Sequence, residues 1–155
     1  GSTWSSMTSN TFSTILTIWG SGPADVFTSG INGRITHYNG AARSVMSSGT
    51  TEVLVGIWGT SATDVFAAGG GTILHYNGSS WSAMMANTTS ALQAVWGTSP
   101  TDVFSVGYDG TIMHYDGTAW SAMTSNTTYD LNDVSGTSWD NVFAVGADGT
   151  IVRYN

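Results

Sequence analysis

The sequence predicts an all-β protein built from four repeated units. Three observations support this: a repeat of about 39 residues, short β-rich runs within each repeat, and no helical periodicity. Trp19, Trp58 and Trp96 recur at intervals of 39 and 38 residues, and Ser135 stands at the fourth position, 39 residues further on. A Phe follows each position by eight residues, within Asp-Val-Phe or Asn-Val-Phe. Self-similarity at such a period indicates a repeat architecture.

Each unit contains four short runs rich in β-branched and aromatic residues. In the second unit these runs cover roughly 53–58, 64–68, 72–76 and 81–84. The breaks between them are turn sequences, such as Asn77-Gly78, in which both residues tolerate positive φ. Runs this short, without a period of 3.6 residues, argue against helices. Four-stranded units of about 40 residues have the size of β-propeller blades.

We therefore expect a single β-propeller domain over residues 1–155, with four four-stranded antiparallel blades. The blade repeats cover about 15–46, 54–84, 92–123, and 131–155 plus 1–7. The last unit lacks its fourth run, but Trp4 and Met7 stand five and eight places after Tyr154 when the count continues from Asn155 to Gly1. The N-terminal strand is thus predicted to close the last blade, which leaves no strand edge open.

Four blades can be closed in two ways. One chain can close a four-bladed ring, or two chains can exchange strands and form eight blades. Four blades is the low end for propellers and requires steep angles between neighbours. We therefore favour a homo-oligomer, a dimer over a monomer. The whole number of units also suggests a fragment excised from a larger propeller, or a designed protein.

The repeat resembles bacterial propeller repeats with the pattern W-G-T-S-x-x-D-V-F-x-x-G-x-x-G-T-I-x-H-Y-x-G, and more loosely tryptophan–aspartate-repeat propellers. The resemblance covers the whole chain. It implies the propeller fold and says little about activity, because such propellers serve as scaffolds, adhesins and lectins.

Composition excludes several classes of partner. Charged residues make up 8% of the chain, with three Arg, no Lys and a net charge of −7. Nucleic acid and anionic membranes need a cationic surface, so neither is an expected partner. The absence of Cys rules out disulfides and zinc–thiolate sites within this sequence. No cofactor is expected, and the compartment stays open, with a preference for the outside of the cell or its surface.

A set of Trp, Asp and His recurs in three units and changes as a whole in the fourth. The complete sets are Trp19/Asp25/His37, Trp58/Asp64/His75 and Trp96/Asp102/His114, whereas the fourth unit has Ser135, Asn141 and Arg153. Joint replacement suggests a structural contact network inside each blade, in which the Asp accepts a hydrogen bond from the His. A shared metal site is not expected, because equivalent positions in neighbouring blades lie on the order of 10 Å apart, whereas zinc ligands lie at ~2 Å from the ion.

Ligand-binding candidates are loop residues that depart from the repeat. They lie in the turns between the second and third runs and before the first run of each unit: Asn32, Glu52, Tyr108, Asp109, Tyr129, Asp130 and Asp148. Both sets of loops emerge on one face of a propeller, and loops on a rigid scaffold often bind ligands. Unconstrained loops also vary without function, so this alternative stays open.

The sequence favours a non-catalytic propeller scaffold or binding module that self-assembles from near-identical blades. No catalytic motif is present, and an enzyme is not predicted. The alternative is a carbohydrate-binding lectin, in which exposed aromatics and Asn, Thr and Asp side chains would contact a glycan; a protein ligand is also possible. Trp4, Trp81 and Trp120 could stack on sugars, or could cover the edges of their blades as structural residues.

Overall fold

The computed structural model describes residues 3–9 and 11–155, and its regular structure is almost entirely antiparallel sheet. Three sheets have four strands and the last has three, and the sheets are numbered as blades 1 to 4 in chain order. The first contains β1 (Ile15–Gly22), β2 (Asp25–Gly30), β3 (Ile35–Tyr38) and β4 (Arg43–Met46). The second contains β5 (Gly56–Ser61), β6 (Asp64–Gly69), β7 (Thr72–Tyr76) and β8 (Trp81–Met84). The third contains β9 (Leu92–Ser99), β10 (Asp102–Gly107), β11 (Ile112–Tyr115) and β12 (Trp120–Met123), and the fourth β13 (Leu131–Ser138), β14 (Asn141–Gly146) and β15 (Ile151–Tyr154).

The turn between the third and fourth strands has the same chemistry in each complete blade. In blade 2, the Asn77 side-chain oxygen accepts hydrogen bonds from the backbone N–H groups of Ser79 and Ser80. Gly78 follows with φ of +89°, a left-handed conformation that costs glycine little. An Asx turn followed by glycine reverses the chain tightly.

The turn between the second and third strands explains the irregular repeat length. Three blades have a short 3₁₀ turn there: η1 (Ile31–Gly33), η2 (Tyr108–Gly110) and η3 (Ala147–Gly149). The middle residue of each is left-handed: Asn32, Asp109 and Asp148. Blade 2 instead turns through Gly70 and Gly71, both with positive φ, and is one residue shorter.

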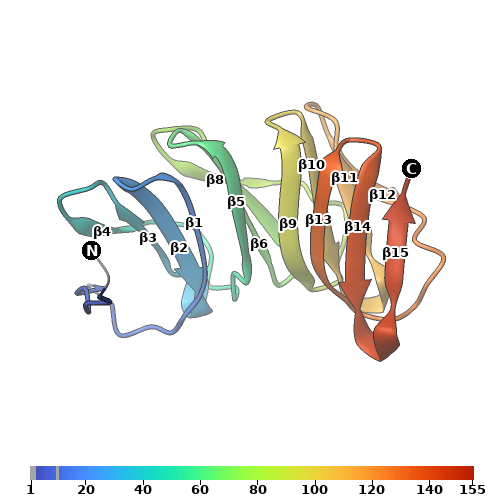
Figure 1. The fold of residues 1–155 in the computed structure, drawn as a ribbon, viewed down its shortest axis with the longest axis horizontal. Coiled ribbons are helices and arrows are strands. Elements are labelled where there is room, and N and C mark those ends of the chain that lie inside the picture. Colours follow the sequence, from blue (N-terminus) through green and yellow to red (C-terminus); the bar gives the residue numbers. More distant parts are fainter. Residues whose placement is uncertain (1–2, 10) are drawn as a thin grey trace.

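The four sheets stand side by side as the blades of an open arc (Figure 1). Their inner strands contact one another in chain order, β1 with β5, β5 with β9, and β9 with β13. The core lies between blades rather than within them. Phe27 and Ile35 of blade 1, for example, pack with Leu54, Ile57 and Val65 of blade 2. The predicted all-β propeller with four antiparallel blades is confirmed.

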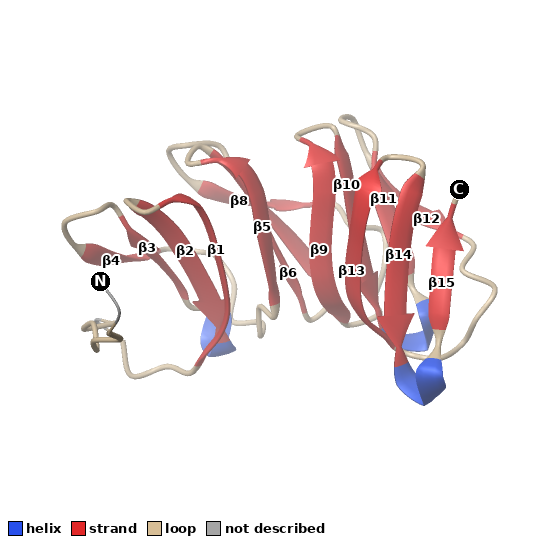
Figure 2. Cartoon of the chain, in the orientation of Figure 1, coloured by secondary structure: helices blue, strands red, loops and turns tan. Residues whose placement is uncertain are grey.

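The two ends of the arc are open. Blade 1 and blade 4 lie at opposite ends, and the described N-terminal residues lie beside blade 1, away from β15 (Figures 1 and 2). Residues 3–9 belong to no strand, and the last sheet ends at β15. The predicted closure of blade 4 by residues 1–7 is therefore not formed within the described part of this single chain, and residues 1 and 2 lie outside that part. Closure stays a prediction.

Candidate functional site

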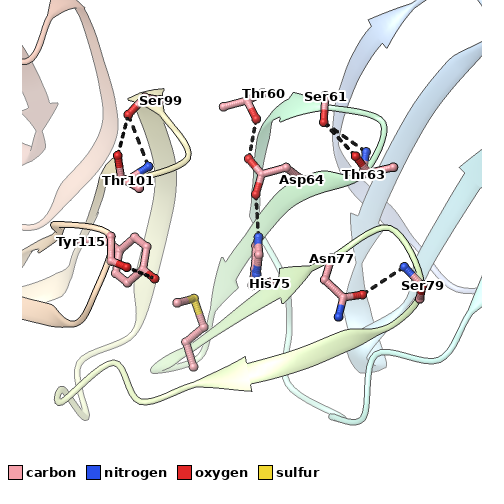
Figure 3. A network of polar contacts seen from close by, with 12 residues as sticks. Thr60, Ser61, Thr63, Asp64, His75, Asn77, Ser79, Ser99, Thr101 and Tyr115 are labelled. Carbon is pink, nitrogen blue, oxygen red and sulfur yellow. Dashed lines mark hydrogen bonds and ion pairs between the residues drawn. The ribbon is translucent and has the colours of Figure 1, made fainter.

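Each of the first three blades contains a linked hydroxyl, carboxylate and imidazole. In blade 2, the Thr60 hydroxyl donates to one oxygen of Asp64, and His75 Nε2 lies 2.7 Å from the other, Oδ1 (Figure 3). β5 and β6 supply the first two side chains, and β7 supplies the histidine. Asp64 is shielded from solvent, with 18% of its side chain exposed. Both carboxylate oxygens of Asp64 thus have a partner within the blade.

The aromatic rings connect this polar set to the next blade. The His75 ring packs on Phe66 at 4.6 Å between centroids, and Trp58 lies 6.2 Å from the same Phe66. Trp58 also reaches blade 3, where a Cβ on Gly97 would lie 2.8 Å from Trp58 Cη2. Trp58 therefore joins the network by ring packing, and Gly97 leaves room for it.

The same arrangement recurs with a change of chemistry. His37 Nε2 lies 2.6 Å from Asp25 Oδ1, and His114 Nε2 lies 2.7 Å from Asp102 Oδ1. In blade 4, Arg153 Nε donates to Asn141 Oδ1 at 3.1 Å, and Asn141 Nδ2 donates to Thr137 Oγ1 at 2.7 Å. The structure brings the predicted Asp and His residues together in each of the first three blades. Their structural role stays a prediction.

The sequence interpretation missed the hydroxyl member of the set. The missed residues are Ser21, Thr60, Thr98 and Thr137. Each follows a conserved spacing, two residues after the Trp or its Ser135 equivalent, and this regularity is the signal that could have identified them.

The order of the three groups does not match nucleophilic catalysis. In a hydrolytic triad the imidazole lies between the hydroxyl and the carboxylate, so that it can remove the hydroxyl proton. Here the carboxylate lies between them, and the Thr60 hydroxyl donates to Asp64. The arrangement can fix three strands of a blade together, but it does not provide an activated nucleophile.

Five of the seven loop candidates lie in or beside two equivalent clefts. An open cleft of about 710 Å³ at blade 3 is lined by Asp109 and Tyr129, among others, and Asp130 Oδ1 accepts a hydrogen bond from the Asp109 N–H at 3.0 Å. The corresponding cleft at blade 1, about 720 Å³, contains Asn32, and Glu52 adjoins it through its carbonyl, which accepts from Gly33 N–H.

Two other loop candidates lie elsewhere. Tyr108 is 45% exposed and lies in η2, outside the cleft lining, and Asp148 lies in η3 and lines neither cleft. Among the described residues no group of three or more His, Asp or Glu side chains is close enough to hold a metal ion. No helix in the described part of the chain is both long and apolar enough to cross a membrane.

The three Trp residues at the outer-strand position of the repeat divide into two buried ones and an exposed one. Trp81 and Trp120 are 8% and 2% exposed, so neither presents a face on which a sugar could stack. They pack on the preceding blade, with Trp81 6.3 Å from Phe27 and Trp120 6.5 Å from Phe66 between ring centroids. Trp4, the third residue of this type, is fully exposed.

Solved structures similar to this chain are propellers. YCF48 from Cyanidioschyzon merolae superposes with a TM-score of 0.74 at 13% identity, over 91% of this chain and 50% of that one. The computationally designed Ika4 protein gives 0.76 at 16%, over 94% and 92%. The WD40 β-propeller domain of Doa1 gives 0.75 at 12%, over 90% and 49%.

Sequence comparisons give no closer assignment. No protein-family model matches the chain. No curated protein matches it either. The chain spans about half the length of YCF48 and of the Doa1 domain. At identities of 12–16% the likeness concerns the fold, and it shows that this chain is a β-propeller loosely similar to WD-repeat proteins.

Proposed function

We propose that this chain is a non-catalytic propeller scaffold, one domain of residues 1–155, that forms an eight-bladed ring from two copies. The observation that carries the proposal is an arc of four blades whose two ends expose the surfaces that neighbouring blades bury elsewhere. Such an arc can hide these surfaces only by meeting another blade.

The exposed surfaces are complementary by their place in the repeat. Leu16 and Ile18 form the first end face, on blade 1, and Phe143, Val145 and Ile151 form the last end face, on blade 4. Ile18 is 65% exposed, whereas its equivalent in blade 2, Ile57, is 7% exposed because it packs on blade 1. A first end face therefore fits a last end face as blade 2 fits blade 1.

Two copies can satisfy both faces at once. In a two-fold dimer, each chain places its first end face on the last end face of its partner, and the ring closes. The superposition on about half of YCF48 and half of the Doa1 domain, with TM-scores of 0.74 and 0.75, supports this proposal, because the four blades match part of structures about twice as long.

Light scattering behind a sizing column tests the assembly. We expect twice the chain mass of 16.2 kDa. Ile18→Asp should reduce the mass to that of one chain, because burying an unpaired carboxylate is costly. Val53→Asp is the matched control, since Val53 is also exposed but lies in the connection before β5. A single-chain mass for the unaltered protein at every concentration would refute the assembly.

The scaffold would present its ligand at the clefts formed by the second-to-third-strand turns. A protein ligand is the first expectation, because a solved structure of the similar YCF48 holds a bound D1 peptide. The open clefts at blades 1 and 3 offer mainly backbone, Asn, Thr and Ser groups. These uncharged groups supply hydrogen bonds, and Arg34 at blade 1 and Asp109 at blade 3 add one charged side chain to each cleft.

A lectin is the second candidate, favoured by one observation. Tyr129 is 50% exposed and lines the blade 3 cleft together with Asn87 and Asp109, so an aromatic ring lies beside hydrogen-bonding side chains. On a glycan array we expect saturable binding that Tyr129→Ala abolishes. Tyr108→Ala is the control, because this exposed tyrosine lies outside the cleft lining. If the unaltered protein binds no glycan on the array, the lectin hypothesis is rejected.

A further inference from the structure

The contacts of Trp120 define how an outer-strand tryptophan locks two blades together. Its ring lies edge-on to Phe66 of blade 2, 6.5 Å between centroids, and 5.4 Å from Tyr115 of its own blade. Its indole Nε1 donates to Met84 Sδ at 3.4 Å, and its backbone carbonyl accepts from Asn87 Nδ2 at 3.2 Å. Buried at 2% exposure, it seals the wedge between blades 2 and 3.

The wedge between blades 3 and 4 contains the same partners without a tryptophan. A pocket of about 90 Å³ there is lined by Phe104, Met123, Asn126 and Tyr154, among others. These four are the repeat equivalents of the four residues that contact Trp120. Phe104 and Tyr154 stand 6.1 Å apart, the same separation as Phe66 and Tyr115 in the occupied wedge. The pocket is thus already arranged for an indole.

The N-terminal segment has the spacing of an outer strand and one hydrogen bond of the connection that follows such a strand. Trp4 precedes Ile15, the start of β1, by eleven residues, as Trp120 precedes Leu131, the start of β13. The Ser9 hydroxyl donates to the Thr11 carbonyl, which is the bond that Ser125 makes to Thr127 in the connection between blades 3 and 4. By repeat position and by this hydrogen bond, the residues before β1 therefore match the connection that follows an outer strand in the complete blades.

We propose that Trp4 of a second copy enters the pocket between blades 3 and 4, and that residues 4–7 add to β15 as its missing antiparallel neighbour. The inference rests on the proposed dimer and names how each copy holds the other. In the ring of two chains, the blade preceding blade 1 is the partner's blade 4. Each chain then contributes one strand to the other, and the exposed edge of β15 gains a hydrogen-bonded partner.

The expected register follows from the complete blades. Met113 faces Ala122 across β11 and β12, so Val152 should face Ser6 of the second copy. Directly paired antiparallel residues have Cα atoms about 4.5–5.5 Å apart, within the range that a disulfide spans. Because the chain contains no cysteine, any disulfide that forms must join engineered cysteines.

The test is the double variant Ser6→Cys/Val152→Cys, oxidised and run on a non-reducing gel. We expect a covalent dimer that reduction converts to single chains. Met113→Cys/Ala122→Cys is the matched control, because the same pair one blade earlier lies within one chain and should link without forming a dimer.

Each outcome separates the inference from the proposed function. A dimer by light scattering without a cross-link would overturn the strand exchange and leave the assembly standing. A single-chain mass with an internal link would show closure in cis and overturn both. A second measurement uses the dimer dissociation constant: Trp4→Ala should raise it at least about 30-fold, as loss of a central aromatic anchor does. Trp139→Ala, which removes another exposed tryptophan, in the β13–β14 turn, should leave it unchanged.

Discussion

Blades 2 and 4 have nearly the same strand pattern and very different surroundings. Phe66 and Ile73 of blade 2 are 1% and 0% exposed, whereas their equivalents Phe143 and Ile151 are 40% and 69% exposed. Blade 3 covers blade 2, and no blade of this chain covers blade 4 (Figure 1). Burial in this protein therefore comes from the neighbouring blade, as expected for a repeat protein whose stability depends on interfaces between units.

The Asp–His set of blade 2 and the Asn–Arg set of blade 4 differ in the same way: the first is covered by a neighbouring blade and the second is open. In blade 2 the His75 ring packs on Phe66, its Nε2 lies 2.7 Å from Asp64 Oδ1, and Trp58 extends to the next blade. In blade 4, Arg153 occupies the histidine position and lies over the Phe143 ring, 5.5 Å from its centroid. A guanidinium is always charged and needs solvent or several acceptors. The replacement suits a blade whose face is open in the single chain.

The largest expected effect contrasts the two phenylalanines. Phe66→Ala should lower the free energy of unfolding by about 3–5 kcal/mol, because it leaves a cavity between blades. Phe143→Ala should cost no more than about 1–2 kcal/mol at concentrations where the chain is monomeric, since the ring is already partly solvated. Urea unfolding at low protein concentration measures both. Equal losses would mean that blade 4 is covered in the monomer.

Dimer formation should change the difference between the Phe66→Ala and Phe143→Ala variants. When concentration rises above the dissociation constant, Phe143 should become buried, and the cost of Phe143→Ala should grow toward that of Phe66→Ala. Concentration-dependent unfolding of the two variants would follow the change.

A smaller effect is expected from the polar sets. Asp64→Ala leaves Thr60 and His75 without their shared acceptor, and should cost about 1.5–3 kcal/mol. Asn141→Ala in blade 4 should cost about 1 kcal/mol, because its partners can turn to water. Thermal unfolding compares the two.

A conservative variant separates charge from hydrogen bonding. Asp64→Asn keeps an oxygen for His75, and its amide can donate to Thr60 as Asn141 donates to Thr137. It should therefore retain most of the stability that Asp64→Ala loses. A melting temperature unchanged by Asp64→Ala would refute the structural network.

The fold could be predicted because the blades repeat nearly the same signals. The Trp-Gly motif, the Asn-Gly turns and the four short runs give the strands and their order without long-range information. The Asp–His pairs could be anticipated from joint replacement alone. The ring packing could not: Trp58 contacts Phe66 and the backbone near Gly97 because of the angle between blades, and a repeat spacing carries no angle.

The candidate site was harder to predict for a related reason. The sequence grouped seven loop residues on one face, but they separate into Asp109, Tyr129 and Asp130 at blade 3 and Asn32 and Glu52 at blade 1, with Tyr108 and Asp148 outside both clefts. Asn32 and Glu52 lie two blades away. Sequence gives the face, and the number of blades between two loops decides whether they share a cleft.

The smallest expected effect lies at a turn where the position of the blade should not matter. Asp116 Oδ1 accepts from the N–H groups of Thr118 and Ala119, at 2.8 and 2.9 Å, as Asn77 does in blade 2. The Ala119 bond, followed by that from Thr118, lowers the pKa of Asp116 below its ordinary value of 3.8. At neutral pH, Asp116→Asn should therefore leave the melting temperature unchanged.

Acid should reveal the difference between the two side chains. A carboxyl whose pKa is lowered on folding contributes stability above its unfolded value, and this contribution is lost as the pH falls through the folded pKa. The unaltered protein should thus lose more stability than Asp116→Asn between about pH 5 and pH 2. The Asn side chain does not titrate, so its oxygen accepts these hydrogen bonds at every pH in this range. Melting curves of both proteins across this range measure the difference. If both proteins lose the same stability as the pH falls, this turn is held by the Gly117 backbone. The side-chain acceptor at the first position of the turn is then dispensable in every blade.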